Sequence, residues 1–117
     1  MHKILVVDDE PNMLELYLKE LGEEGYEVKT VCCGEEALKV AQTEKFDLVI
    51  LDIKMDKMDG LSTLSELKKL KKGIPVILNS AYTTYKSDFH SWLADSYMVK
   101  SSNLSELKNK IGDLIKV

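Results

Sequence analysis

The chain has 117 residues, which suits a single domain, and its 44% hydrophobic and 31% charged residues are typical of a folded protein rather than a disordered one. The formal net charge of −4 argues against a nucleic-acid-binding surface, which normally carries an excess of Lys and Arg. No apolar run exceeds four residues, whereas a membrane-spanning helix needs about 20, and the N-terminus shows no secretory signal.

The first half of the chain predicts two strands and two helices in alternation. Residues 4–7 are a continuous apolar run, which predicts a strand buried on both faces. Apolar residues recur at helical spacing from residue 11 to about residue 24, where Pro11 suits the first turn of a helix. A second, more exposed strand is predicted at residues 26–31, and a second helix at residues 35–43.

The second half continues the alternation. Residues 48–51 predict a third buried strand, and leucines spaced through residues 61–70 predict a helix. Residues 75–78 and 97–99 predict two further strands, with a weaker helical pattern at residues 85–93 between them. Asn103 and Glu106 form a capping signal for a last helix, which extends to about residue 115.

These strand–helix units, joined by short connections, predict an α/β fold in which a parallel sheet is doubly wound, with helices on both faces. The unbroken apolar strands at residues 4–7 and 48–51 belong at the centre of that sheet. The chain stops at the end of the last helix, so we expect one domain over residues 1–117 with no room for another.

Polar side chains follow the predicted strands at the edge where ligands bind to such sheets. Asp8 and Asp9 follow the first strand, Asp52 the third, Ser80 the fourth and Lys100 the fifth. Each of these residues alone is more often a helix cap, a turn residue or a solvated charge. Their convergence on one edge from four strands favours a functional site instead.

Three clustered carboxylates repel one another and require a cation. Oxygen ligands with an incomplete protein shell suit Mg²⁺, which retains water molecules in its octahedron. A carboxylate beside Mg²⁺ and a lysine can attack a phosphoryl group to form an acyl phosphate, while the metal, the lysine and a hydroxyl stabilise its oxygens. The residues therefore predict a Mg²⁺-dependent aspartyl-phosphate site.

The sequence resembles the CheY-like receiver domain of bacterial two-component response regulators. The resemblance runs from Lys3 to about Ile115 and rests on four motifs, which are residues 5–10 (Leu-Val-Val-Asp-Asp-Glu), residues 51–55 with 58–60, Ser80-Ala81, and residues 97–100. It implies a flavodoxin-like (β/α)5 fold with a five-stranded parallel sheet in the strand order 2-1-3-4-5. It also implies a signalling function in a two-component system or phosphorelay.

The resemblance implies a role for each matching residue. Asp52 is the expected phosphoacceptor and a Mg²⁺ ligand. Asp9 is expected to bind Mg²⁺ directly and Asp8 mainly through water, with the backbone carbonyl of Lys54 as a further ligand. Lys100 is expected to pair with the phosphoryl group.

The resemblance also implies a switch that changes partner binding. Ser80 is the expected switch hydroxyl, and Tyr97 is the aromatic residue that follows its movement. Phosphorylation would then alter the face formed by the fourth helix, the fifth strand and the last helix. The implied partners are a sensor histidine kinase or a histidine phosphotransfer protein, and a downstream protein target.

Several positions depart from the family pattern. Asp56-Lys57 stand where Pro-Gly is usual, Ser101 stands where proline is usual, and the segment before the fifth strand is short, which concerns the output switch more than the phosphoryl chemistry. Lys54 and Tyr82 stand at two positions that tune dephosphorylation in receivers. Neither side chain suits the orientation or deprotonation of water, so we expect a long-lived phosphorylated form.

A Mg²⁺-dependent phosphohydrolase with an Asp nucleophile is the alternative from another functional class. Such enzymes usually place a second acid two residues after the nucleophile, and this chain has Lys54 there. We therefore expect an interaction module and not an enzyme. A receiver cut from a longer regulator is a third interpretation.

The two cysteines, Cys32 and Cys33, are adjacent. A disulfide between adjacent residues is strained and rare, and no second Cys/His cluster completes a zinc site. We interpret them as two reduced thiols at the end of a strand, which fits a cytoplasmic protein. With the charge and the short apolar runs, this leads us to expect neither a nucleic-acid nor a membrane partner.

Overall fold

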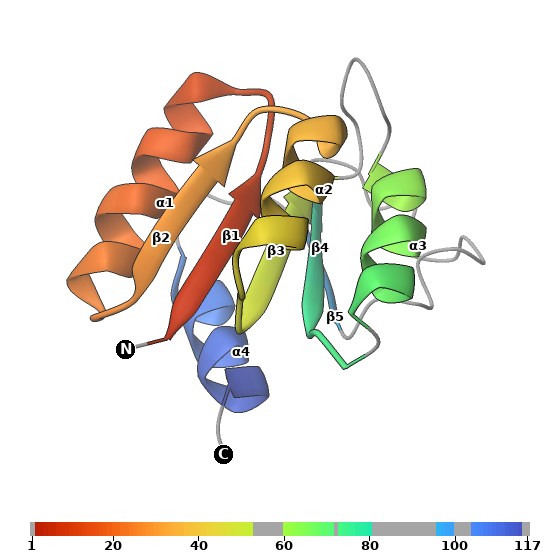
Figure 1. Cartoon of the computed structure of the whole chain (residues 1–117). Coiled ribbons are helices and arrows are strands. Elements are labelled where there is room, and N and C mark those ends of the chain that lie inside the picture. Colours follow the sequence, from red (N-terminus) through yellow and green to blue (C-terminus); the bar gives the residue numbers. More distant parts are fainter. Residues whose placement is uncertain (1, 53–59, 72, 81–95, 100–103, 116–117) are drawn as a thin grey trace.

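The computed structural model describes residues 2–52, 60–71, 73–80, 96–99 and 104–115. Strands and helices alternate through residue 80, and one further strand and one further helix are described after it (Figure 1). The strands are β1 (Lys3–Val7), β2 (Glu27–Val31), β3 (Leu48–Asp52), β4 (Val76–Ser80) and β5 (Ser96–Val99). The helices are α1 (Pro11–Glu23), α2 (Gly34–Thr43), α3 (Gly60–Leu70) and α4 (Ser105–Ile115).

The strands form one parallel sheet in the order β2-β1-β3-β4-β5. This order confirms the predicted 2-1-3-4-5 arrangement, and β1 and β3, which contain the apolar runs at residues 4–7 and 48–51, lie inside the sheet as expected. The burial pattern of β2 alternates between exposed and half-buried residues because it is an edge strand.

Each central strand sends alternate side chains into two separate hydrophobic clusters. Leu5 and Val7 of β1 belong to one cluster, which includes residues of α2 and α3. Ile4 and Val6 belong to the other, which includes residues of α1 and α4. The sheet is therefore covered on both faces, which confirms the doubly wound prediction and explains why its central strands carry apolar runs without alternation.

Two strands extend further toward their carboxyl ends than the apolar pattern predicts. β3 includes Asp52, and β4 ends at Ser80 instead of at residue 78. The reason is that strand pairing continues past the last apolar residue, with Asp52 in register with Asn79. Asn79 and Ser80 are thus the last residues of β4 and do not follow it.

The other observed boundaries lie within one or two residues of the predicted ones. α1 begins at Pro11 as expected, and its chain turns back toward β2 at Gly25, whose φ of 94° is a conformation that favours glycine. The last helix begins at Ser105. The helix predicted at residues 85–93 and the capping residue Asn103 lie outside the described residues.

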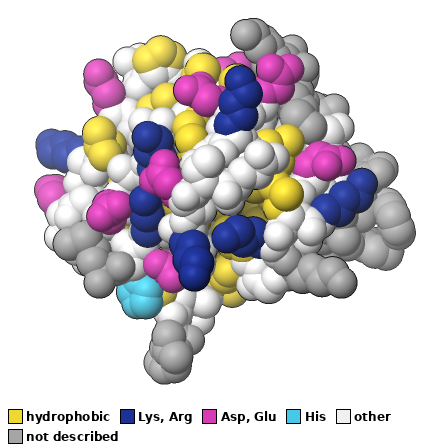
Figure 2. Space-filling view, in the orientation of Figure 1, with side chains coloured by type: hydrophobic (Ala, Val, Ile, Leu, Met, Phe, Trp, Pro, Cys, Tyr) yellow, Lys and Arg dark blue, Asp and Glu magenta, His cyan; other side chains and the backbone are white. Residues whose placement is uncertain are grey.

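Charged side chains of both signs are interspersed over the face shown in Figure 2. At the amino end of the sheet, Lys3 of β1 pairs with Glu44 and lies 3.4 Å from a carboxylate oxygen of Glu27. The hydrogen bond to Glu44 holds the pKa of Lys3 above its usual value. On the side of the sheet that α1 and α4 cover, the ammonium group of Lys108 on α4 donates a hydrogen bond to Glu20 of α1 at 2.9 Å. This contact joins the two helices.

One polar pair lies inside the otherwise apolar cluster beneath α1. The side-chain amide of Asn79 donates a hydrogen bond to the hydroxyl of Tyr17, and the two residues are only 5% and 1% exposed. An asparagine in an apolar strand needs such a partner, because a buried amide without one loses its hydrogen bonds to water. The pair ties the middle of α1 to the carboxyl end of β4.

We predict that Tyr17→Phe destabilises the protein by about 1–3 kcal/mol, because it deprives a buried amide of its acceptor while leaving the ring in place. Chemical denaturation with urea measures the change. Tyr26→Phe is the matched control, since Tyr26 is half-buried and the described residues show no hydrogen bond to its hydroxyl. Equal stability losses in the two variants would contradict the prediction.

Candidate functional site

Three carboxylates meet at the carboxyl edge of the sheet. Val7 and Leu51 are in register on the adjacent strands β1 and β3, so the residues that come next, Asp8 and Asp52, lie side by side. One carboxylate oxygen from each of Asp8, Asp9 and Asp52 lies within 4.8 Å of the other two. The structure therefore brings together the three acidic residues that the sequence predicts at this edge.

The backbone around Asp8 holds its carboxylate in place. The backbone amide of Glu10 donates to Oδ1 of Asp8 at 2.9 Å, and the amide of Asp8 itself donates to the carbonyl of Val31 at 3.2 Å. Asp8 and Asp52 are 1% and 5% exposed, whereas Asp9 is half-buried. Two of the three carboxylates are thus buried, and the cluster is accessible to solvent mainly at Asp9.

The close approach of three carboxylates favours a bound cation. Two like charges about 4 Å apart repel by roughly 4 kcal/mol at the effective dielectric of a protein surface. The donors in this cluster are all carboxylate oxygens, which are hard ligands, and the protein supplies too few of them to complete a shell. This set fits Mg²⁺, which keeps several water molecules in its octahedron and tolerates few protein ligands.

The remaining predicted site residues are described only in part. Ser80 ends β4 one residue beyond Asn79, and its backbone is in register with Val99 of β5. Tyr97 lies in β5 in register with Leu78. The structure therefore places Ser80 on β4, the strand next to β3, and Tyr97 on β5, the strand beyond β4, while Lys54 and Lys100 lie outside the described residues.

Sequence reasoning missed two side-chain groupings near this edge. The partnership of Asn79 with Tyr17 was not predicted, although an asparagine between apolar strand residues is itself a sign of a buried partner. The second grouping is that of Cys32 and Cys33 with Glu36, whose donor atoms also lie within 4.8 Å of one another. Glu36 carries no sequence signal for this role, because its approach depends on the turn between β2 and α2.

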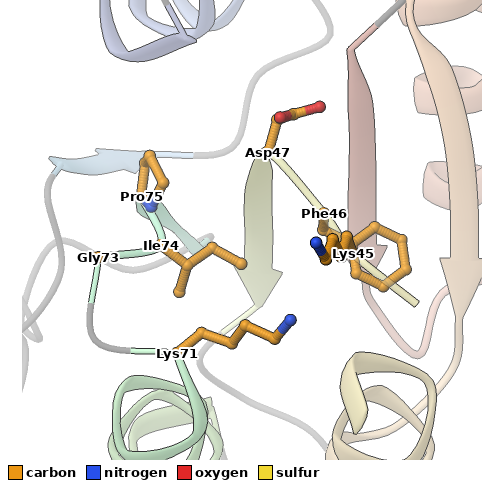
Figure 3. A pocket seen from close by; sticks show the side chains of 7 residues that line it. All are labelled: Lys45, Phe46, Asp47, Lys71, Gly73, Ile74 and Pro75. Atoms are coloured by element: carbon orange, nitrogen blue, oxygen red, sulfur yellow. The ribbon is translucent and has the colours of Figure 1, made fainter. Parts of the chain in front are cut away.

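A cavity of about 460 Å³ lies at the opposite, amino end of the sheet. Figure 3 shows its lining side chains, which come from the segments before β3 and β4 and from the end of α3. The residues that line it are Lys45, Phe46, Asp47, Lys71, Gly73, Ile74 and Pro75. Ligands of parallel sheets bind at the carboxyl ends of the strands, so the acidic cluster and not this cavity is the candidate functional site.

The comparison with known protein families matches almost the whole chain. A family model described as the response regulator receiver domain matches residues 4–112. The probable transcriptional regulator ycf27 of Cyanidium caldarium is 37% identical over 117 residues, which cover 98% of this chain and 47% of that protein. The chain spans about half the length of such curated relatives.

Solved structures give a closer match over a full chain. The response regulator protein TrrA from Thermotoga maritima, in complex with Mg²⁺-BeF, is 54% identical with a TM-score of 0.95, over 97% of this chain and 99% of that one. TrrA in complex with the histidine kinase ThkA matches with a TM-score of 0.92, again at 54% identity, over 97% of this chain and 98% of that one.

Within the described part of the chain, no helix has the length and apolarity to cross a membrane.

We predict that Mg²⁺ stabilises the protein through the acidic cluster. At about 100 times its dissociation constant, the ion should add about 2.7 kcal/mol to the free energy of unfolding, because it binds only the folded state. Asp9→Asn should lose most of this gain, and without metal it should be at least as stable as the wild type because one repulsive charge is gone. Thermal unfolding with and without Mg²⁺ measures both effects.

Asp113→Asn is the control, since it removes the same charge from an exposed position on α4. It should keep the full response to Mg²⁺. An Asp9→Asn variant that Mg²⁺ stabilises as much as the wild type would show that the cluster is not the binding site.

Proposed function

Because the chain belongs to the response regulator receiver domain family, we propose that it accepts a phosphoryl group on Asp52 in a Mg²⁺-dependent reaction and signals through that modification. The observation that carries the proposal is the cluster of Asp8, Asp9 and Asp52 at the carboxyl edge of the sheet. We propose a single receiver domain over the chain.

The position of Asp52 suits a nucleophile that must react in one orientation. It ends a central strand that is paired on both sides, so its backbone is held on a rigid element. One of its carboxylate oxygens attacks the phosphorus atom, the bond from phosphorus to the donor breaks, and a mixed anhydride remains on Asp52. Mg²⁺, when bound, supplies positive charge that offsets the developing charge on the phosphoryl oxygens.

The ligands of that ion are proposed from the same cluster. Asp9 is the most accessible of the three carboxylates, which suits direct coordination, while the carboxylate of Asp8 is engaged by the amide of Glu10 and acts mainly through water. Asp52 and the backbone carbonyl of Lys54 complete the proposed protein ligands. Lys100 is the proposed ion-pair partner of the phosphoryl group.

The phosphoryl donor that we propose is a sensor histidine kinase or a histidine phosphotransfer protein. The complex of TrrA with the kinase ThkA supports this donor class, because TrrA is 54% identical to this chain over nearly its whole length. The response would pass through Ser80 and Tyr97 to the face that contains β5 and α4. A downstream protein would then bind this face differently in the two states.

This function also separates the chain from a hydrolase that uses an aspartate nucleophile. A hydrolase needs a group that deprotonates or orients water for rapid turnover. The residue two positions after Asp52 is Lys54, a cation without an acceptor lone pair. We therefore propose a signalling module that holds its phosphoryl group and does not turn over external substrates.

We predict that Asp52 takes up one phosphoryl group from acetyl phosphate and that the reaction requires Mg²⁺. Intact-protein mass spectrometry should show a single addition to the wild type. The addition should be absent with EDTA and in Asp52→Asn, because the first removes the cation and the second removes the nucleophile. Asp113→Asn should be labelled like the wild type.

Two outcomes would contradict the proposal. Labelling of Asp52→Asn to the wild-type extent would move the phosphoacceptor elsewhere. Sustained release of phosphate from p-nitrophenyl phosphate by the wild type, lost in Asp52→Asn, would favour the hydrolase.

We further predict that the phosphorylated form decays over minutes to hours rather than seconds. Lys54 has no lone pair to accept a proton from the attacking water, and Tyr82 carries a bulky phenol, which is poorly suited to deprotonate water. Decay of the labelled protein in Mg²⁺ after removal of the donor gives the lifetime. The double variant Lys54→Asn, Tyr82→Glu should decay faster, and an unchanged lifetime in that variant would refute the assignment.

A further inference from the structure

A second group of metal-ligating side chains lies beside the acidic cluster, at the junction between β2 and α2. Cys32 and Cys33 connect the last residue of β2, Val31, to the first residue of α2, Gly34. The two thiol sulfurs and a carboxylate oxygen of Glu36 all lie within 4.8 Å of one another. Cys32 and Glu36 are exposed and Cys33 is half-buried, so an ion can reach these donors from solvent.

The observed separation of the Cys32 and Glu36 donor atoms is close to the one that a tetrahedral ion requires. Sγ of Cys32 lies 3.3 Å from Oε2 of Glu36, to which it donates a hydrogen bond. Zinc–sulfur and zinc–oxygen bonds of about 2.3 and 2.1 Å at a tetrahedral angle place the two donors roughly 3.6 Å apart. An ion therefore fits between Cys32 and Glu36 after a small outward movement of either side chain.

The chain geometry accounts for the meeting of three donors so close in sequence. Adjacent residues of a continuous strand point to opposite faces, but the chain leaves β2 at Val31 and enters α2 at Gly34, so it turns between the two cysteines and the helix. Glu36 then lies in the first turn of α2 and returns toward Cys32.

We propose that Cys32, Cys33 and Glu36 bind a thiophilic divalent cation, of which Zn²⁺ is the type, with two sulfur ligands, one oxygen ligand and a fourth position open to water. Its two sulfur donors favour a soft metal ion, whereas the oxygen-only cluster of Asp8, Asp9 and Asp52 favours a hard one. Three protein ligands with an open position are an established zinc arrangement. This inference does not depend on the proposed function.

Binding exchanges protons for the ion. Sγ of Cys32 donates its proton in a hydrogen bond to the carboxylate of Glu36. The cation takes the place of that proton, and both thiols bind as thiolates, with the released protons passing to solvent.

The two sites are linked through the backbone. The carbonyl of Val31, one residue before Cys32, accepts the hydrogen bond from the amide of Asp8. A cation on the thiols would therefore lie next to the strand end that holds the carboxylates.

Co²⁺ is the probe that tests the proposal, because it takes tetrahedral sites and shows a thiolate-to-metal charge-transfer band only when sulfur binds it. The full chain is reduced with a phosphine, kept in excess Mg²⁺ to fill oxygen-only sites, and titrated with Co²⁺. We expect the band to saturate at one ion per chain and to disappear when Zn²⁺ is added. Sedimentation of the loaded protein should show a monomer.

Variants assign the ligands. Cys33→Ser should abolish the band. Glu36→Gln should weaken Co²⁺ binding by about tenfold or more, because the loss of a residue that only hydrogen-bonds to a metal ligand already lowers metal affinity by that factor. Glu35→Gln, which removes the neighbouring carboxylate in the same helical turn, and Asp52→Asn should both leave the titration unchanged. Far-UV circular dichroism confirms that each variant is folded.

Three results would overturn the proposal. The first is the absence of a charge-transfer band in the reduced wild type, and the second is an undiminished band in Cys33→Ser. The third is a band that saturates at one ion per two chains together with a dimer in sedimentation, which would show an ion bridging two copies instead of a chelate within one.

Discussion

The parallel register between β1 and β3 is the constraint on which the site depends. Val7 and Leu51 are partners in this register, so Asp8 and Asp52, 44 positions apart in the printed sequence, end side by side. A slip of one residue would turn Asp52 to the other face of the sheet and send its apolar neighbours the wrong way. Because both faces of β1 and β3 are buried, that slip is costly, and the packing of the whole domain maintains the carboxylate cluster.

The same packing explains how a polar pair is accommodated in the core. Asn79 is in register with Asp52, and its amide reaches the hydroxyl of Tyr17 on α1. An apolar pair of similar size and shape would stabilise the fold about as well. The hydrogen bond instead requires one orientation of both side chains, so it specifies how α1 meets the end of β4. That end is the backbone that carries Ser80.

The carboxyl edge of the sheet holds two donor groups of different chemical character. The first group contains only carboxylate oxygens and suits a hard ion, whereas the second contains two sulfurs and suits a soft one. The two groups differ in ligand type, and a backbone hydrogen bond from the amide of Asp8 to the carbonyl of Val31, the residue before Cys32, joins the segments that carry them. Selectivity between Mg²⁺ and a thiophilic ion at this edge therefore rests on ligand softness.

The order of the strands was implied by the resemblance to receiver domains. The sequence by itself determined the fold class and the presence of acidic residues at one edge. It could do so because local apolar periodicity reports burial, and because consecutive strands of a parallel sheet end on the same side. Tertiary structure alone decided the rest. Pairing with neighbouring strands extended β4 to Ser80, the packing of α1 on the sheet brought Tyr17 to Asn79, and the turn into α2 brought Glu36 to Cys32. Each of these contacts joins side chains whose sequence spacing carries no signal, because it depends on how separate elements pack or how the chain turns between them.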